Sequence, residues 1–98
     1  MKRKAEKSFP VKLLISLAVL ILLIAVATEF YHRTEGWERF DSAYFSVITF
    51  TTIGYGDMVP QTDAGRIGTM VFSLLGIAVA FHFLVLFGGY IFEKKASE

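Results

Sequence analysis

The sequence predicts an all-α membrane protein, in which two membrane-spanning helices flank a shorter helix and a glycine-containing loop. Three observations lead to this fold class. The chain has only 98 residues, and 54% of them are hydrophobic. Two apolar runs are long enough to cross a bilayer, and an apolar segment of about half that length lies between them. A small soluble domain buries only about 60% of the surface of its unfolded chain, so the bilayer is the expected solvent.

The first apolar run is Val11–Phe30, and its only charged side chains are Lys12 and Glu29. A helix of this length is about 30 Å long, which matches the hydrocarbon core of a bilayer. The sequence therefore predicts an outer helix over residues 11–31. Residues 1–10 are rich in lysine and arginine, and they form either a solvated tail or an interfacial helix on anionic lipid.

A second, shorter apolar segment, Phe40–Phe50, follows a polar stretch, Tyr31–Arg39, which we expect to be a surface loop. A helix of this size is about 17 Å long and cannot cross the bilayer. Asp41 or Ser42 can cap its start. An apolar helix of half the bilayer thickness beside true spans predicts a re-entrant helix over residues 40–51.

The second long run, Ile67–Phe92, contains no Asp, Glu, Lys or Arg. As a helix this run is about 39 Å long, so it has to tilt, bend or protrude from the bilayer. It predicts an inner helix over residues 64–92. Basic residues gather at both chain ends, whereas the central loop holds most of the acidic ones. We therefore expect both termini, including the tail 93–98, in the cytoplasm and the central loop outside.

The segment Thr51–Asp57 reads T-T-I-G-Y-G-D and follows the short helix. An unpaired N–H or C=O group costs several kcal/mol in hydrocarbon, so extended backbone at this depth has to be buried in protein or to line a watery path. Gly54 and Gly56 can take positive φ at little steric cost. Their alternation with L-residues lets successive carbonyl groups turn to the same side.

The result is a ladder of oxygen atoms that can replace the hydration shell of a cation. We expect Ile53 and Tyr55 to point their side chains away from the ladder and to pack behind it. The oxygens come from the Thr52 hydroxyl and from the carbonyl groups of Thr52, Ile53, Gly54 and Tyr55. The alternative is a turn or short hairpin between two spans, which would not explain the half-length apolar helix before it.

T-T-I-G-Y-G-D resembles the potassium-channel signature in its Ile form. The stretches D-S-A-Y-F-S-V-I-T-F-T-T-I-G and P-Q-T-D-A-G-R-I are similar to bacterial two-transmembrane channels, among them the sodium/potassium type, which carries G-D-G instead of G-Y-G. The resemblance covers about residues 11–92. It implies one ion-channel pore domain over residues 1–98, with a pore helix over 40–51 and a selectivity filter over 52–57. Tyr55 favours selective, passive conduction of K⁺ over Na⁺.

The resemblance also implies a homotetramer in the bilayer and roles around the filter. Asp57 is expected to accept a hydrogen bond from Tyr44, at a position where relatives carry Trp, although simple packing of Tyr44 is an alternative. Thr51 and Gly56 support the filter. Ile48 stands where some relatives hold a buried Glu, so the slow filter inactivation of those relatives is in doubt.

In the inner helix, Gly76 matches the gating hinge of the family, and close packing of a Gly76–Ala80 pair is the alternative. Phe81 matches a pore-facing position near the inner gate, where four rings could narrow or dewet the path, and lipid or subunit packing is the alternative. His82 lies mid-membrane, but we favour Phe81 as the pore-facing residue.

The sequence also limits the other classes of function. The chain has no cysteine, and its net charge is only +1. It has no nucleophile–base pair and no phosphate-binding loop, so we do not expect an enzyme. We expect no organic cofactor and no nucleic-acid partner either. No helix has the arginine spacing of a voltage sensor. The gate is therefore autonomous, or a C-terminal regulatory domain is missing. Two alternatives to a potassium channel of the plasma membrane stay open: a weakly selective cation channel and a non-conducting regulatory subunit.

Overall fold

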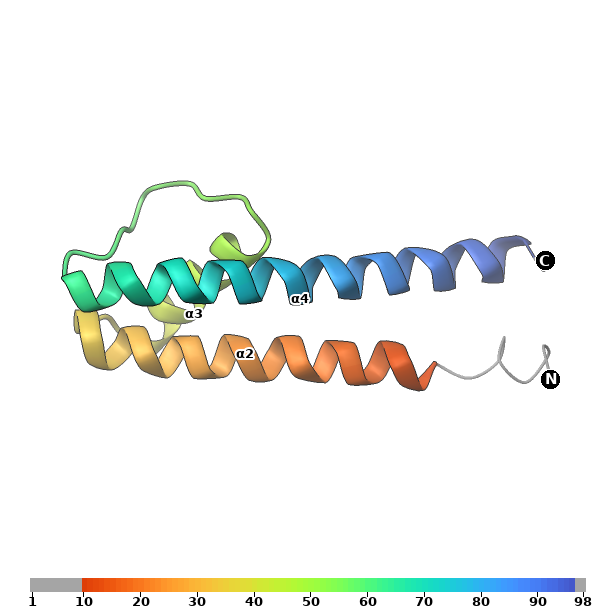
Figure 1. Ribbon diagram of the computed structural model, residues 1–98, viewed down its shortest axis with the longest axis horizontal. Coiled ribbons are helices and arrows are strands. Elements are labelled where there is room, and N and C mark those ends of the chain that lie inside the picture. Colours follow the sequence, from red (N-terminus) through yellow and green to blue (C-terminus); the bar gives the residue numbers. More distant parts are fainter. Residues whose placement is uncertain (1–9, 97–98) are drawn as a thin grey trace.

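The computed structural model describes residues 10–96, and within this range the chain forms three helices (Figure 1). Helices α2 (Val11–Glu35) and α4 (Asp63–Ala96) lie antiparallel and side by side, and both described chain ends lie at the same end of this pair. Helix α3 (Arg39–Phe50) packs against both long helices near the other end. The predictions for residues 1–9 and 97–98 concern residues outside the described range.

Helices α2 and α4 are long and apolar enough to cross a bilayer. Helix α4 has 34 residues and is therefore about 51 Å long, well beyond a hydrocarbon core of about 30 Å. The predicted end at residue 92 was wrong, because the helix continues to Ala96. Glu93, Lys94 and Lys95 are good helix formers, so the loss of apolar character there does not end the helix.

The predicted end of the outer helix at residue 31 was also too early. Helix α2 continues for another turn to Glu35 and ends where Gly36 adopts the left-handed conformation, with φ of 79°. Tyr31 was expected at the boundary between the outer helix and a surface loop, but it lies well inside the helix and is 1% exposed. The predicted helix end was placed where the side chains become polar, whereas the helix itself ends at the left-handed glycine.

Helix α3 begins at Arg39, with Glu38 as the N-cap residue and no side-chain hydrogen bond at the cap. The predicted caps, Asp41 and Ser42, were therefore wrong. Asp41 lies in the first turn, where a carboxylate still interacts favourably with the helix dipole. Ser42 is fully buried, and its hydroxyl has no hydrogen-bond partner within the described chain.

A cluster of aromatic side chains joins the three helices at the α3 end of the molecule. Tyr31 is at its centre and makes an edge-to-face contact with Phe45 of α3, with ring centroids 5.0 Å apart. The Tyr31 hydroxyl lies 2.6 Å from Oγ1 of Thr69 on α4. Thr69 donates its own proton to the Gly65 carbonyl, so Tyr31 is the donor. The other members are Phe30, Trp37, Phe50 and Phe72.

Candidate functional site

The chain leaves α3 through Thr51, which is tied back to the last turn of the helix. The Thr51 amide and hydroxyl both donate hydrogen bonds to the Val47 carbonyl, at 3.0 Å and 2.7 Å. These bonds satisfy a carbonyl that would otherwise lack a partner at the helix end. The segment predicted as a filter therefore starts at a fixed point at the C-terminal end of α3.

Two more backbone hydrogen bonds hold the first half of that segment against the end of α3. The amide of Thr52 donates to the Thr49 carbonyl at 3.1 Å, and the amide of Gly54 donates to the Ile48 carbonyl at 3.0 Å. The amides at positions 52 and 54 thus point back toward the helix. Their carbonyl groups remain available for other partners.

The backbone of this segment alternates in conformation from one residue to the next. Thr52, Gly54 and Gly56 have φ of 66°, 55° and 81°, whereas Ile53 and Tyr55 are not among the positive-φ residues. Alternation of positive and negative φ can turn successive carbonyl groups to one side. A Cβ atom at Gly54 or Gly56 would meet nothing within 4 Å, so both glycines are needed for their conformation rather than for space.

Positive φ at Thr52 was not predicted from the sequence. A β-branched residue rarely adopts this conformation, because its side chain clashes with the backbone. Strain of this kind is typical of functional segments that the surrounding structure holds in place. Thr52 is held by the hydrogen bond from its own amide to Thr49 and by the bonds that its neighbours Thr51 and Gly54 make to the end of α3.

The carbonyl groups of residues 52–55 accept no hydrogen bond within residues 10–96, and this part of the chain is exposed. Ile53 and Tyr55 were expected to pack behind the backbone. In the single chain they do not, because their side chains are 51% and 68% exposed. A strand with unpaired carbonyl groups on one side and exposed apolar side chains is incomplete by itself in a membrane.

Tyr44 and Asp57 link α3 to the end of the predicted filter. The Tyr44 hydroxyl donates a hydrogen bond of 2.8 Å to Oδ2 of Asp57. This bond to a carboxylate, together with desolvation and the negative charge, raises the pKa of Tyr44 above its ordinary value. Behind the segment, Ile48 is 6% exposed, so an apolar side chain fills that position.

Glu35, at the end of α2, holds the loop that follows the predicted filter. Its carboxylate accepts hydrogen bonds from the amides of Gln61 and Thr62, at 2.8 Å and 3.3 Å, and from the Thr62 hydroxyl at 2.6 Å. The Thr62 hydroxyl also accepts a bond from the Gly65 amide and so caps α4. Sequence reasoning missed Glu35, because its partners lie 26 and 27 residues away. Thr62, by contrast, carries a recognisable N-cap signal.

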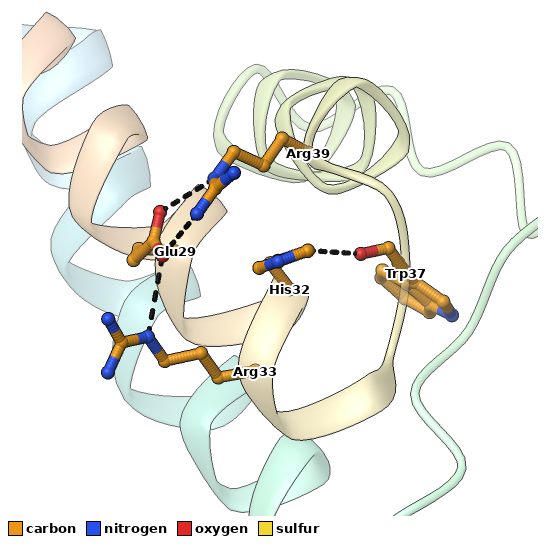
Figure 2. A network of polar contacts seen from close by, with 5 residues as sticks. All are labelled: Glu29, His32, Arg33, Trp37 and Arg39. Atoms are coloured by element: carbon orange, nitrogen blue, oxygen red, sulfur yellow. Dashed lines mark hydrogen bonds and ion pairs between the residues drawn. The ribbon is translucent and has the colours of Figure 1, made fainter.

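A second polar group joins α2 to the start of α3 (Figure 2). Glu29 binds Arg39 through two contacts of 3.1 Å and Arg33 through one of 3.4 Å. Nearby, Nδ1 of His32 lies 2.6 Å from the Trp37 carbonyl oxygen. The four charged or titratable side chains come from the C-terminal part of α2 and from the start of α3, so they link these two helices.

The inner-helix residues singled out in the sequence face different directions. Gly76 is buried against Phe50, and a Cβ atom there would lie 2.3 Å from the Phe50 ring. Ala80, one turn later, is also buried. Helix α4 continues without a break through Gly76, which supports close packing at this position. Phe81, in contrast, is 67% exposed.

Comparison with known proteins identifies the family of this chain. The model of the ion channel family matches residues 18–93. Among curated proteins, the chain is 38% identical over 87 residues to "Probable potassium channel protein 2" of Methanocaldococcus jannaschii, covering 89% of this chain and 25% of that protein. It is 37% identical over 71 residues to "Potassium channel protein 1" of the same organism, covering 71% and 21%.

A human protein, "Potassium channel subfamily K member 12", is 41% identical over 64 residues, covering 58% of this chain and 15% of that protein. The chain thus spans a quarter or less of the length of these relatives. The family match and the two bilayer-length helices together show that the chain is a membrane protein and belongs to the ion channel family.

Proposed function

We propose that the chain is the pore of a potassium-selective channel, which conducts K⁺ passively through a filter of backbone carbonyl groups. Helix α2 is the outer helix, α3 the pore helix, residues 52–57 the filter and α4 the inner helix. The ion ligands are the carbonyl oxygens of Thr52, Ile53, Gly54 and Tyr55, with the Thr52 hydroxyl. The named potassium channels among the relatives support this assignment.

The observation that carries the proposal is the alternating backbone of Thr52–Gly56, whose carbonyl groups have no partner in the chain. Potassium channels use carbonyl oxygens to replace the hydration shell of the ion. The C-terminal end of α3 lies beside this segment, and its partial negative charge favours a cation there. Thr51, Gly56, Asp57 and Tyr44 support the filter in this proposal.

A homotetramer completes the site. Potassium is well served by about eight oxygens, which two stacked rings of four supply. Heterologous contacts that close into a ring also cover apolar surface that one chain leaves exposed, such as Ile53 and Tyr55. Gly76 and Phe81 are the candidates for movement and closure of the inner helix. Phe81 is exposed on a face turned away from Phe50 and is therefore free to face the four-fold axis.

Finer assignments follow from the same proposal. Within the family, we assign the chain to the group of bacterial two-helix channels that includes the sodium/potassium type, with G-Y-G in place of the G-D-G of that type. The pore is placed in the plasma membrane with both termini in the cytoplasm, as the basic chain ends favour. Weakly selective cation conduction is the second candidate, because the carbonyl ladder alone does not fix the ratio of K⁺ to Na⁺.

A flux assay tests the proposal. Purified protein is reconstituted in liposomes, and cation uptake is followed under a potassium gradient and, separately, under a sodium gradient, with barium as blocker. We expect potassium flux that barium blocks and much smaller sodium flux. Equal fluxes would favour the weakly selective channel, and an absence of flux from a verified tetramer would contradict conduction altogether.

A further inference from the structure

Two adjacent glycines, Gly88 and Gly89, interrupt the apolar sequence of α4 near its C-terminal end. Their φ values are not positive, both residues are exposed, and a Cβ atom at either position would meet nothing within 4 Å. Glycine weakens a helix relative to alanine, because it is freer in the unfolded chain and leaves the backbone open to water. The pair therefore makes α4 less rigid at this point without allowing any closer packing within residues 10–96.

The glycines in the first half of α4 differ from this pair, because they allow close packing. Added Cβ atoms at Gly65, Gly68 and Gly76 would collide with side chains of α2 or α3. The buried residues of α4 are Gly65, Gly76 and Ala80, and none of the described residues after Ala80 is buried. The first half of α4 is thus fixed to the other two helices, whereas the glycine pair lies in the part that packs less.

The position of the pair relative to the bilayer also favours bending. The helical stretch from Asp63 to Gly88 is about 38 Å long, which exceeds a hydrocarbon core of about 30 Å. Helix hydrogen bonds that open at the membrane surface are replaced by bonds to water, whereas unpaired backbone groups are costly in hydrocarbon. Gly76 lies only about 20 Å along the helix, inside the core, where opening of the backbone is disfavoured.

Helix α2 begins alongside α4 just before the level of the glycine pair. Lys12, in the first turn of α2, and Leu86 line one groove between the two helices. Figure 1 shows that α4 continues past the start of α2 as one unbroken helix. The pair thus follows directly on the last turn of α4 that α2 accompanies within residues 10–96.

Phe92 lies on the segment of α4 that follows the glycine pair, and it is 75% exposed. At 3.6 residues per turn, its side chain is about 20° around the helix from Phe81 and about 16 Å further along it. If Phe81 faces the axis of the proposed tetramer, Phe92 faces it too. Four Phe92 rings would then narrow the path a second time, and apolar constrictions of this kind gate channels by dewetting.

We propose that Gly88–Gly89 is a joint at which the last turns of α4 bend, and that this bend moves Phe92 away from the pore axis. In the straight helix the four Phe92 rings stay in line with Phe81 and close the path. Gly76 is the other candidate for movement of the inner helix, but its contact with Phe50 holds α4 straight there. The role of Phe92 rests on the proposed function, because it requires a pore, whereas the joint itself does not.

Distance measurements by pulsed electron paramagnetic resonance test the joint without any need for conduction. The chain has no cysteine, so pairs of cysteines can be introduced and spin-labelled. Val26→Cys with Lys95→Cys spans the joint, and the control pair, Val26→Cys with Leu84→Cys, spans Gly76 but not the joint. All three labelled positions are exposed. Labelled chains are assembled with an excess of the cysteine-free chain, so that each distance reports on one chain.

We expect the distance distribution across the joint to be about twice as wide as that of the control pair, as for a helix that kinks at glycine. Gly88→Ala/Gly89→Ala should narrow it to about the width of the control, and each single variant should narrow it partly. Alanine has space at both positions, so these variants should fold. Val71→Ala, which raises helix propensity at an exposed position of α4 before the joint, should change neither distribution.

Two results from the distances would overturn the joint. One is a pair of wild-type distributions of equal width. The other is a wide distribution across the joint that the two alanines do not narrow, which would indicate fraying of the helix end.

Potassium flux in liposomes then tests the role of Phe92. Gly88→Ala/Gly89→Ala should lower the flux about five-fold or more, because each alanine stabilises the straight helix. Phe92→Ala should remove this loss, because no ring is left to move. Unchanged flux in the double-alanine variant, or the same loss when Phe92→Ala is present, would overturn this role. A wild type without flux would contradict the proposed function and the role of Phe92 together, whereas the distances decide on the joint alone.

Discussion

Gly54 is held at φ of 55° in open space, so only its backbone conformation requires glycine. An alanine there would cost roughly 1–2 kcal/mol in the left-handed conformation, and the strain would be relieved by turning the carbonyl out of the ladder. We predict that Gly54→Ala abolishes selective potassium flux in liposomes.

Gly36→Ala provides the matched control for this variant. Gly36 has φ of 79° and nothing near its missing Cβ, but it ends α2 and is far from the filter in the sequence. The Gly36→Ala variant should lose about as much stability as Gly54→Ala, but it should keep the preference of the channel for potassium over sodium. Retained potassium preference in Gly54→Ala would contradict the assigned role of the carbonyl ladder.

The hydrogen bond from Tyr44 to Asp57 makes a prediction about pH. Because the pKa of Tyr44 is raised in the folded protein, the bond stabilises the folded state fully at pH values below the ordinary tyrosine pKa of about 10. This stabilisation is lost as the pH rises through the raised pKa of the folded protein. The thermal midpoint of wild type should exceed that of Tyr44→Phe by a constant amount at neutral pH. The difference should shrink above about pH 10.

Tyr44→Trp separates the hydrogen bond from the titration. An indole N–H also donates to a carboxylate, but it does not titrate in this range. This variant should keep much of the stability of wild type and show no loss specific to high pH. A wild-type advantage over Tyr44→Phe that persists unchanged to the highest pH measured would contradict the assignment.

At the scale of elements, Gly76 lets α4 approach α3. A Cβ atom there would lie 2.3 Å from Phe50, so Gly76→Ala should destabilise the protein by about 1–3 kcal/mol through overpacking. Phe50→Leu provides space, and the double variant should recover part of that loss. Thermal or denaturant unfolding of the four proteins measures the coupling.

This cycle also separates the two readings of Gly76. If Gly76 acts as a hinge, alanine stiffens α4 at this point whatever residue lies at position 50. The channel formed by the double variant would then open as slowly as the channel formed by Gly76→Ala. Additive effects of the two substitutions on stability would contradict close packing as the reason for glycine at this position.

Glu35 connects the end of α2 to the loop before α4 through three accepted hydrogen bonds. Glu35→Ala should lower the stability of the folded protein by about 1 kcal/mol, because the site is largely open to solvent. Glu35→Gln keeps one acceptor oxygen and should lose less. Thermal unfolding measures the difference. Equal unfolding midpoints for wild type, Glu35→Ala and Glu35→Gln would show that other contacts hold the loop.

The elements show what the sequence could and could not predict. The two spans and the half-length helix followed from apolar length, which the bilayer fixes within narrow limits. Helix ends were less predictable. Helix α2 runs past Tyr31 to Glu35, because the left-handed backbone conformation of Gly36, and not the polarity of the side chains, ends it. The Glu35 contacts were beyond reach, because they depend on how α2 and the distant loop come together.

Within the site, the glycine spacing predicted positive φ at Gly54 and Gly56, but nothing in the sequence marked Thr52 for the same conformation. The exposure of Ile53 and Tyr55 was not foreseen either. The sequence predicts that both side chains pack behind the backbone, but one chain has too few atoms there to cover them.

At the scale of the whole molecule, these exposed side chains and unpaired carbonyl groups are what the proposed homotetramer would cover. Four copies would place the filter segments around one axis. The most direct test is a diffraction experiment on the purified channel with rubidium in place of potassium. We expect anomalous peaks on a four-fold axis, at the level of the carbonyl groups of residues 52–55. A chain whose oxygens at these positions surround no ion, or do not converge on a shared axis, would contradict the account.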